Sequence, residues 1–309
     1  MTAAPDVHVE LLDDATGLPV DPSRLAVTVR VAQREVGRHV TVAARLTEGP
    51  AVEGRLRVSA SFPAAAPWWL VPGAFYGENC PADNDRPYPR FEAGSEPGSG
   101  PAGMTSPWWE LRADRAATVL VCGWGDDGGA GLAADETTAL GMTGLGFAHE
   151  AGRARVWLSF PYAEGPVSYY GDGTPRTAVR ESARFEPGRE VTVAFRTFGL
   201  TADRHDYAAV VRARYAETAD RDPGTAWVDV PEAAELAAHG LHAWHYDPDP
   251  GVLLETVGFD RGVTGQDGRP VDRQAMHVAW ISGVPWAYAL LRHADRTGRA
   301  DYRAAATRV

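Results

Sequence analysis

The stretch RLRVSASF, residues 55–62, alternates polar and apolar side chains along its whole length. Its polar positions are Arg55, Arg57, Ser59 and Ser61, and its apolar positions are Leu56, Val58, Ala60 and Phe62. Successive side chains of a β-strand point to opposite faces, so this period of two predicts a half-buried strand whose apolar face joins a core.

The same alternation recurs on both sides of this stretch. It is found at Val27, Val29 and Val31, at Ala154, Val156, Leu158 and Phe160, and at Val191, Val193 and Phe195, and we expect these apolar sets to face the core. Further β-rich runs are VHVELL (7–12), HVTVAARL (39–46), ATVLVCG (117–123) and TALGMTGLGF (138–147). Many short strands without intervening helices predict an antiparallel β-sandwich over roughly residues 5–199.

After about residue 200 the period changes to that of a helix. Apolar residues at helical spacing predict helices near 204–219, 231–246 and 284–297, and a fourth that starts near Tyr302 and reaches the last residue. We therefore expect a sandwich domain at 1–200, a helical linker at 201–230 and a helical domain at 231–309. Since no cap follows the last apolar stripe, we also expect the chain to be the front part of a longer protein.

Charge and composition exclude several classes of partner. All 30 basic residues are Arg, and 41 acidic residues give the 309-residue chain a net charge of -11. A field of that sign repels a phosphate backbone and an anionic membrane, so we expect neither as a partner and expect neutral or cationic ligands instead. Cys80 and Cys122 lack the spacing of a zinc site, and the sequence predicts no metal and no cofactor. With no signal-like N-terminus, we expect a cytoplasmic protein.

The tract PWWLVPGAFYGENCPADNDRPYPRF, residues 67–91, combines aromatic rings with Asn, Asp, Arg and several prolines. Flat apolar rings beside hydrogen-bonding groups suit a sugar, and prolines reduce the entropy lost when a loop is ordered. One interpretation places Tyr76, Asn79, Asp83 and Arg90 against a ligand, with Trp68 and Trp69 as anchors. The alternative is that the aromatic residues plug the sandwich end or a seam between domains.

The helical segments DRHDYAAVVRARYAE (203–217) and AWISGVPWAYALLRHADRTGRADYRAAA (279–306), placed after a sandwich, resemble the six-hairpin glycosidases. That superfamily includes glucoamylases and disaccharide phosphorylases. The resemblance implies an antiparallel supersandwich followed by α-helices that begin an (α/α)6 toroid. It also implies that the tract 67–91 completes a sugar site built mainly by the helical domain.

By this resemblance the chain is the N-terminal portion of a glycoside hydrolase-like protein acting on neutral oligosaccharides by carboxylate general acid/base chemistry. Twelve helices of about 11–12 residues do not fit between Pro231 and Val309, so the catalytic carboxylate pair is expected beyond residue 309 and this chain alone to be inactive. The alternative is a carbohydrate-binding or protein-interaction module without catalysis.

Several polar residues are candidates for lining a sugar site. Glu255 and Asp260 are such candidates, although both equally suit an ordinary loop, and His277 and Trp280 lie where the resemblance implies a cavity mouth. Glu78, Asp83 and Asp85 could hold a cation, but solvated surface is the favoured interpretation. His242 and His245 are three residues apart with no third ligand in sight, which favours packing over metal binding.

Overall fold

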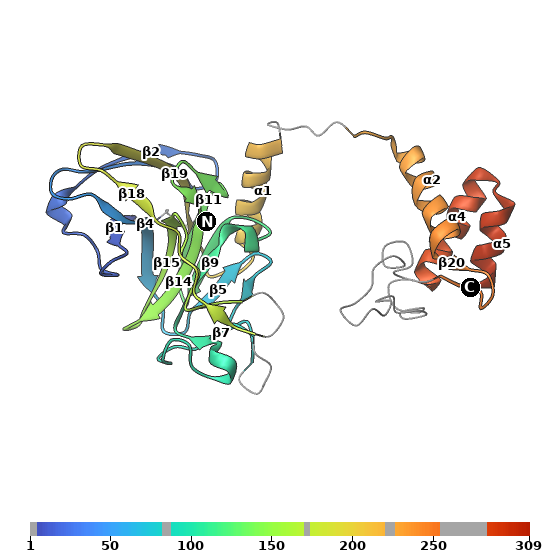
Figure 1. Ribbon diagram of the computed structural model, residues 1–309, viewed down its shortest axis with the longest axis horizontal. Coiled ribbons are helices and arrows are strands. Elements are labelled where there is room, and N and C mark those ends of the chain that lie inside the picture. Colours follow the sequence, from blue (N-terminus) through green and yellow to red (C-terminus); the bar gives the residue numbers. More distant parts are fainter. Residues whose placement is uncertain (1–4, 82–87, 170–173, 220–225, 254–282) are drawn as a thin grey trace. The chain divides into compact units, whose positions relative to one another are not determined.

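The computed structural model describes residues 5–81, 88–169, 174–219, 226–253 and 283–309. By internal contacts the chain divides into two units, Met1–Asp222 and Pro223–Val309. The first unit is built of β-sheets and the second of helices (Figure 1). Among the described residues, no helix combines the length and the apolar character needed to cross a membrane.

Two large sheets make up the first unit, and all strand pairs within them are antiparallel. The six-stranded sheet runs in the order β1 (His8–Asp13), β4 (Val52–Pro63), β15 (Arg153–Phe160), β14 (Gly144–Glu150) and β9 (Trp108–Arg112), with β18 (Ala183–Phe185) also paired to β4. The seven-stranded sheet runs β2 (Leu25–Gln33), β3 (Arg38–Leu46), β19 (Glu190–Leu200), β11 (Gly128–Ala134), β10 (Leu120–Gly125), β5 (Trp68–Val71) and β6 (Phe75–Tyr76).

Short elements connect these strands. Two-residue pairs are β7 (Arg90–Phe91) with β8 (Thr105–Ser106), β12 (Thr137–Thr138) with β13 (Gly141–Met142), and β16 (Val167–Ser168) with β17 (Arg176–Thr177). Single 3-10 turns cover Pro22–Arg24, Pro101–Gly103 and Ala113–Arg115. In the described part of the sandwich, strands are connected by hairpins, loops and 3-10 turns, with no βαβ crossover. This agrees with the predicted antiparallel arrangement.

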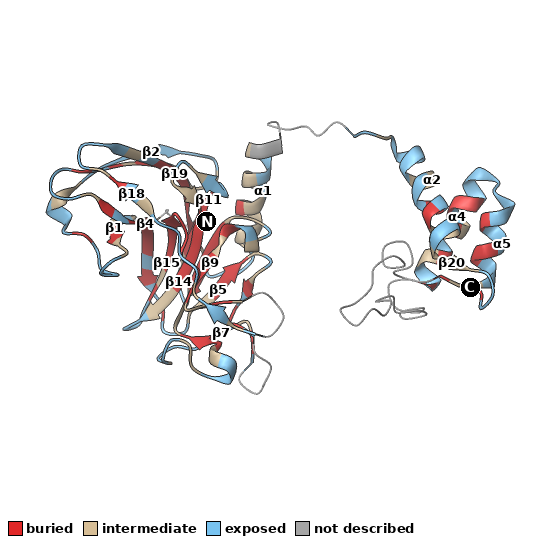
Figure 2. Ribbon diagram, viewed as in Figure 1, coloured by how far each residue is buried: buried red, intermediate tan, exposed pale blue. Residues whose placement is uncertain are grey.

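The core lies between the two sheets. On β4 the predicted apolar face is buried, with Leu56 and Val58 fully covered, and it meets residues of β10 and β11 from the other sheet. Figure 2 shows this buried layer in the middle of the sandwich. The predicted antiparallel sandwich is therefore confirmed.

One predicted core face is wrong. The apolar face of β2 is predicted to join the core, but its valines are 38% to 53% exposed: Val27, Val29 and Val31. The β3 residues that pair with them do have side chains in the core. The reason is that β2 is the terminal strand of its sheet and packs mainly on β3 alone. Alternation shows which side of a strand is apolar, but the second sheet must extend over that side to bury it.

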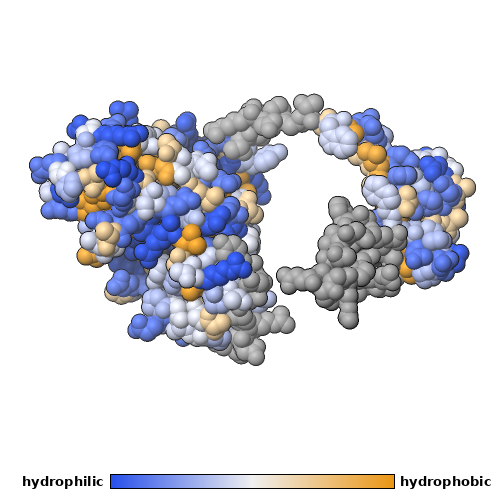
Figure 3. Space-filling model, in the orientation of Figure 1, coloured by the Kyte–Doolittle hydropathy of each residue, from blue (hydrophilic) through white to orange (hydrophobic). Residues whose placement is uncertain are grey.

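Helix α1 (Tyr207–Ala219) packs on the outer face of the seven-stranded sheet. Its Val210 is fully buried in a small apolar cluster with Trp124 and Phe198, and the side-chain carboxylate of Asp206 accepts a hydrogen bond from the Thr201 amide at 2.7 Å. The sandwich surface visible in Figure 3 is mostly hydrophilic, with scattered apolar positions.

The second unit holds α2 (Val230–Gly240), a π-helical turn (Leu241–His245), the hairpin β20 (Tyr246–Asp247) and β21 (Val252–Leu253), α4 (Val284–Thr297) and α5 (Ala300–Arg308). Asp229 caps α2 by accepting the Glu232 amide at 2.8 Å, and Gly298 ends α4 in the left-handed conformation. The predicted helices are present, but the one expected at 231–246 is α-helical only as far as Gly240 and continues as the π-helical turn. The described helices pack on one another through a shared apolar cluster, and they do not show an (α/α)6 toroid.

Candidate functional site

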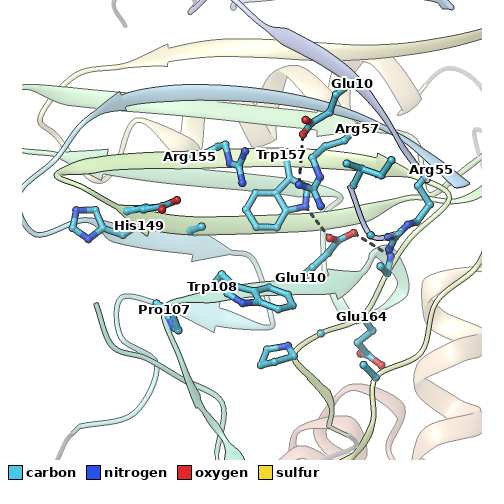
Figure 4. Close-up of a pocket in the computed structure, with 18 of the residues that line it drawn as sticks. Glu10, Arg55, Arg57, Pro107, Trp108, Glu110, His149, Arg155, Trp157 and Glu164 are labelled. Atoms are coloured by element: carbon cyan, nitrogen blue, oxygen red, sulfur yellow. Dashed lines mark hydrogen bonds and ion pairs between the residues drawn. The ribbon is translucent and has the colours of Figure 1, made fainter. Parts of the chain in front are cut away.

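A cavity of about 1010 Å³ lies over the face of the six-stranded sheet that points away from the core (Figure 4). Because Leu56 and Val58 of β4 point inward, the intervening Arg55 and Arg57 point outward and line this cavity. The remaining polar and aromatic lining comes from neighbouring strands and loops: Glu10, Trp108, Glu110, His149, Glu150, Arg155, Trp157, Glu164 and Arg180. The predicted solvent face of β4 is therefore the floor of a cavity.

Trp157 forms the centre of this floor. Its indole lies over Gly146 on the adjacent strand β14, where a β-carbon would come within 2.0 Å of the ring. The side chain is 2% exposed, and its ring nitrogen donates a hydrogen bond to Glu110 Oε2 at 2.9 Å. A glycine on one strand thus makes room for a tryptophan that lies flat on the sheet.

Glu110 on β9 is a buried carboxylate whose two oxygens are both occupied. Besides Trp157, it accepts hydrogen bonds from the Ser159 hydroxyl and from the Ala163 amide, the latter at 3.0 Å. Gly144 again leaves the space, since a β-carbon there would lie 2.6 Å from Glu110 Oε1. Three donors satisfy this buried charge, so Glu110 fixes the indole of Trp157 and the loop at Ala163.

Arginine side chains extend over the same indole. The guanidinium carbons of Arg57 and Arg155 lie 5.0 Å and 5.4 Å from the Trp157 ring centroid, a cation–π arrangement. Burial lowers the pKa of Arg57 from its ordinary value, with Glu110 and Glu10 acting in the opposite direction. Arginine remains protonated throughout the physiological range, so both groups are cations at the cavity floor.

Ion pairs on this floor are incomplete. Arg57 Nη1 lies 3.5 Å from Glu10 Oε1, and Arg55 Nη2 lies 3.0 Å from Asp14 Oδ1. Both carboxylate oxygens are at ion-pair distance, but neither has the geometry of a hydrogen bond, and the buried Nε atoms of both arginines also lack an acceptor.

The cavity walls carry an aromatic ring and a histidine. Trp108 is half-buried and lies against Gly165, where a β-carbon would come within 2.7 Å of the ring. His149 Nε2 lies 2.9 Å from the Ala64 carbonyl oxygen. Glu164 is 1% exposed and pairs with Arg115 at 2.6 Å. The arrangement offers one partly exposed indole face beside charged groups that donate or accept hydrogen bonds.

A second, smaller cavity of about 310 Å³ adjoins the tract 67–91. It is mainly apolar, and its lining includes Phe75, Asn79, Tyr88, Trp109 and Tyr169. Arg115 lines it too, so the Arg115–Glu164 ion pair joins the walls of the two cavities.

The sequence-predicted residues that the structure describes do not line one common cavity. Tyr76 is 53% exposed and its hydroxyl accepts the Gly73 amide at 2.7 Å, outside both cavities. Asn79 lines the smaller cavity with a left-handed backbone, and its amide donates to the Pro89 carbonyl at 2.9 Å. Arg90 lines neither cavity and lies 3.3 Å from Glu92.

The other candidates, Asp83, Glu255, Asp260, His277 and Trp280, lie outside the described residues. Of the two anchors, Trp69 is fully buried and stacks on Phe147 at 4.8 Å, whereas Trp68 is half-buried beside Trp124. His242 and His245 lie against aromatic rings, those of Tyr302 at 5.2 Å and Trp286 at 5.2 Å.

Local sequence pattern does not identify the residues of the larger cavity. The alternation that contains Arg155 and Trp157 predicts only a strand, and no motif singles out Trp108 or Glu110. One signal is available in the sequence, because the large aromatic Trp157 occupies an outward position of β15, where a solvated face usually carries polar or charged side chains. Only strand pairing shows that these positions share one face.

Comparisons with known proteins assign no family. No family model matches the sequence, and no curated protein shows a significant match. Among solved structures, the Slr1438 protein of Synechocystis sp. PCC 6803 aligns over 66% of this chain and 64% of its own, less than two thirds of its length, with 10% identity and a TM-score of 0.32. A galactose mutarotase-like protein of Lactobacillus casei ATCC 334 aligns over 64% and 71%, with 12% identity and a TM-score of 0.31.

The α-N-acetylgalactosaminidase NagBb of Bifidobacterium bifidum aligns over 94% of this chain but 45% of its own, with 10% identity and a TM-score of 0.31. TM-scores this low assign neither a family nor an activity to the chain.

Proposed function

We propose that this chain binds a saccharide in the cavity over the six-stranded sheet, as the non-catalytic part of a glycoside-processing protein. The observation that carries the proposal is the half-buried Trp108 at the wall of a cavity floored by arginine and glutamate side chains. An indole face covers the C–H groups of a sugar, and flanking charged groups bond its hydroxyls. The resemblance to six-hairpin glycosidases supports the same substrate class.

Binding is favoured over bond cleavage at this face. Glycoside hydrolysis needs two carboxylates, one able to give or take a proton and a second that acts as nucleophile or activates water. Glu110 and Glu164 are buried and engaged in hydrogen bonds with protein donors. A hydrolase reaction on neutral oligosaccharides, as the resemblance implies, would therefore draw its catalytic carboxylates from residues other than these two.

Titration of the purified chain with a panel of neutral and acidic oligosaccharides by calorimetry tests the proposal. We expect binding by at least one oligosaccharide, weakened tenfold or more in Trp108→Ala, which is about 1.4 kcal/mol. Trp227→Ala is the matched control, because Trp227 is 85% exposed in the other unit and should leave affinity unchanged. If no oligosaccharide binds, or if Trp108→Ala binds as well as the parent chain, the proposal is wrong.

A further inference from the structure

We propose that the cavity selects a saccharide that carries a carboxylate, such as a uronic acid, and that Arg57 and Arg155 bind this carboxylate. The inference rests on the saccharide-binding function proposed above and names the chemical class of the ligand. It is carried by the surplus of guanidinium donors on the cavity floor.

Two guanidinium groups converge on one ring. Arg57 projects from β4 and Arg155 from β15, and both lie over the indole of Trp157, at 5.0 Å and 5.4 Å (Figure 4). The charge on Arg155 acts against the charge on Arg57 and contributes to lowering the pKa of Arg57. Like charges held together favour an anion that interacts with both.

The protein's own carboxylates neutralise these two guanidinium groups only in part. Both oxygens of Glu110 accept hydrogen bonds from other groups, and Glu10 forms a long ion pair with Arg57 at 3.5 Å. Arg155 has no ion-pair partner within the part of the chain that the structure describes. Glu150 also lines the cavity, but it is exposed and stands opposite Arg153 in the strand register.

Arg57 and Arg155 both line the cavity and are both partly exposed, so their guanidinium groups are accessible to a bound ligand. A planar carboxylate matches the fork of a guanidinium better than a single sugar hydroxyl does.

The net charge of -11 does not oppose this assignment at short range. Interactions between exposed charges are screened beyond about 8–10 Å at ordinary ionic strength. Groups in direct contact with a partly buried ligand are screened much less, so the local arginines decide which ligand is favoured, while the distant acids mainly slow its approach.

The experiment compares acidic oligosaccharides with their own methyl esters. Oligogalacturonate, oligoglucuronate and oligomannuronate are titrated into the full chain by calorimetry, each beside the same oligomer with its carboxyls methyl-esterified. We expect at least one acid to bind ten times or more tightly than its ester. Arg155→Gln should abolish that difference in affinity, and so should the second variant, Arg57→Gln. Arg45→Gln is the control, since Arg45 is exposed on β3, and thermal unfolding checks that every variant is folded.

The outcomes separate this inference from the function on which it rests. If esters or neutral oligosaccharides bind as tightly as the acids, saccharide binding stands and selection for a carboxylate is overturned. If folded Arg155→Gln and Arg57→Gln lose acid and ester affinity equally, the arginines bind hydroxyls and the inference is again overturned. If no saccharide of either kind binds, the proposed function fails together with the inference.

Discussion

The indole nitrogen of Trp157 donates a hydrogen bond to Glu110 Oε2 at 2.9 Å across two strands of the six-stranded sheet. β14, which carries Gly146, lies between the strands of these two residues, and the absence of a side chain at Gly146 permits the contact. The hydrogen bond and the close packing on Gly146 together hold the ring over which Arg57 and Arg155 lie.

Replacing Glu110 should destabilise the sandwich. Glu110→Ala leaves the Trp157, Ser159 and Ala163 donors without their acceptor, and each buried unsatisfied donor costs about 1–3 kcal/mol. We expect a loss of about 3 kcal/mol or more in the free energy of unfolding, measured by urea denaturation. Glu150→Ala, at an exposed position, should stay within about 0.5 kcal/mol. Equal effects of the two substitutions would contradict the role given to Glu110.

A side chain at Gly146 should displace Trp157. The β-carbon of Gly146→Ala would lie 2.0 Å from the ring, and overpacking of this kind costs about 1–3 kcal/mol. In a Trp157→Leu background the same substitution should cost much less, because the ring it strikes is gone. A double-mutant cycle in urea measures the coupling, and an additive result would show that the two residues do not interact.

The two tryptophans of the tract 67–91 should differ in their effect on stability. Trp69 is fully buried and stacked on Phe147, so Trp69→Ala should cost about 3–5 kcal/mol. Trp68→Ala should cost less, because Trp68 is half-buried, and Tyr76→Phe should cost at most about 1.5 kcal/mol for the hydrogen bond from Gly73. Thermal and urea unfolding measure the stability of the three variants. A Trp69→Ala variant as stable as the parent chain would contradict this prediction.

The helical unit should lose stability in acid through Glu235. Its carboxylate accepts hydrogen bonds from His293 at 2.7 Å and from Tyr302 at 2.9 Å, and these lower the pKa of Glu235 from its ordinary 4.5. A carboxyl with a lowered folded pKa contributes stability above the unfolded pKa, and that contribution is lost as the pH falls through the folded pKa.

The measurement is the urea midpoint of the helical circular dichroism signal, followed from about pH 6 to about pH 3, the range over which unperturbed carboxyls titrate. The midpoint of the parent chain should fall over this range by more than that of Glu235→Gln, which has no proton to gain. Parallel curves for the two proteins would rule out Glu235 as a source of the acid sensitivity.

Much of the fold could be predicted from the sequence because it depends on local periodicity. The alternation in RLRVSASF predicts the correct buried face of β4, and the helical spacing predicts α4 within its observed limits, Val284–Thr297. Periodicity failed at Val27, Val29 and Val31, because burial of an apolar face requires a second layer over it, and strand order determines whether that layer is present.

The candidate site was beyond the reach of local pattern. Tyr76, Asn79 and Arg90 are predicted from the composition of one tract, yet of these three only Asn79 lines one of the two cavities described above, the smaller one. Arg57, Glu110 and Trp157 come from three strands far apart in the sequence, and only the register of the sheet brings them onto one face.

The sequence by itself determined that a part rich in antiparallel strands precedes a helical part, and which face of β4 is apolar, because those properties follow from the spacing of neighbouring side chains. The tertiary structure alone decided that Trp157 lies over Gly146, hydrogen-bonds Glu110 and stands beneath two arginines. The physical reason is that strand pairing fixes which distant residues become neighbours, and side-chain hydrogen bonds and ring contacts act only between such neighbours.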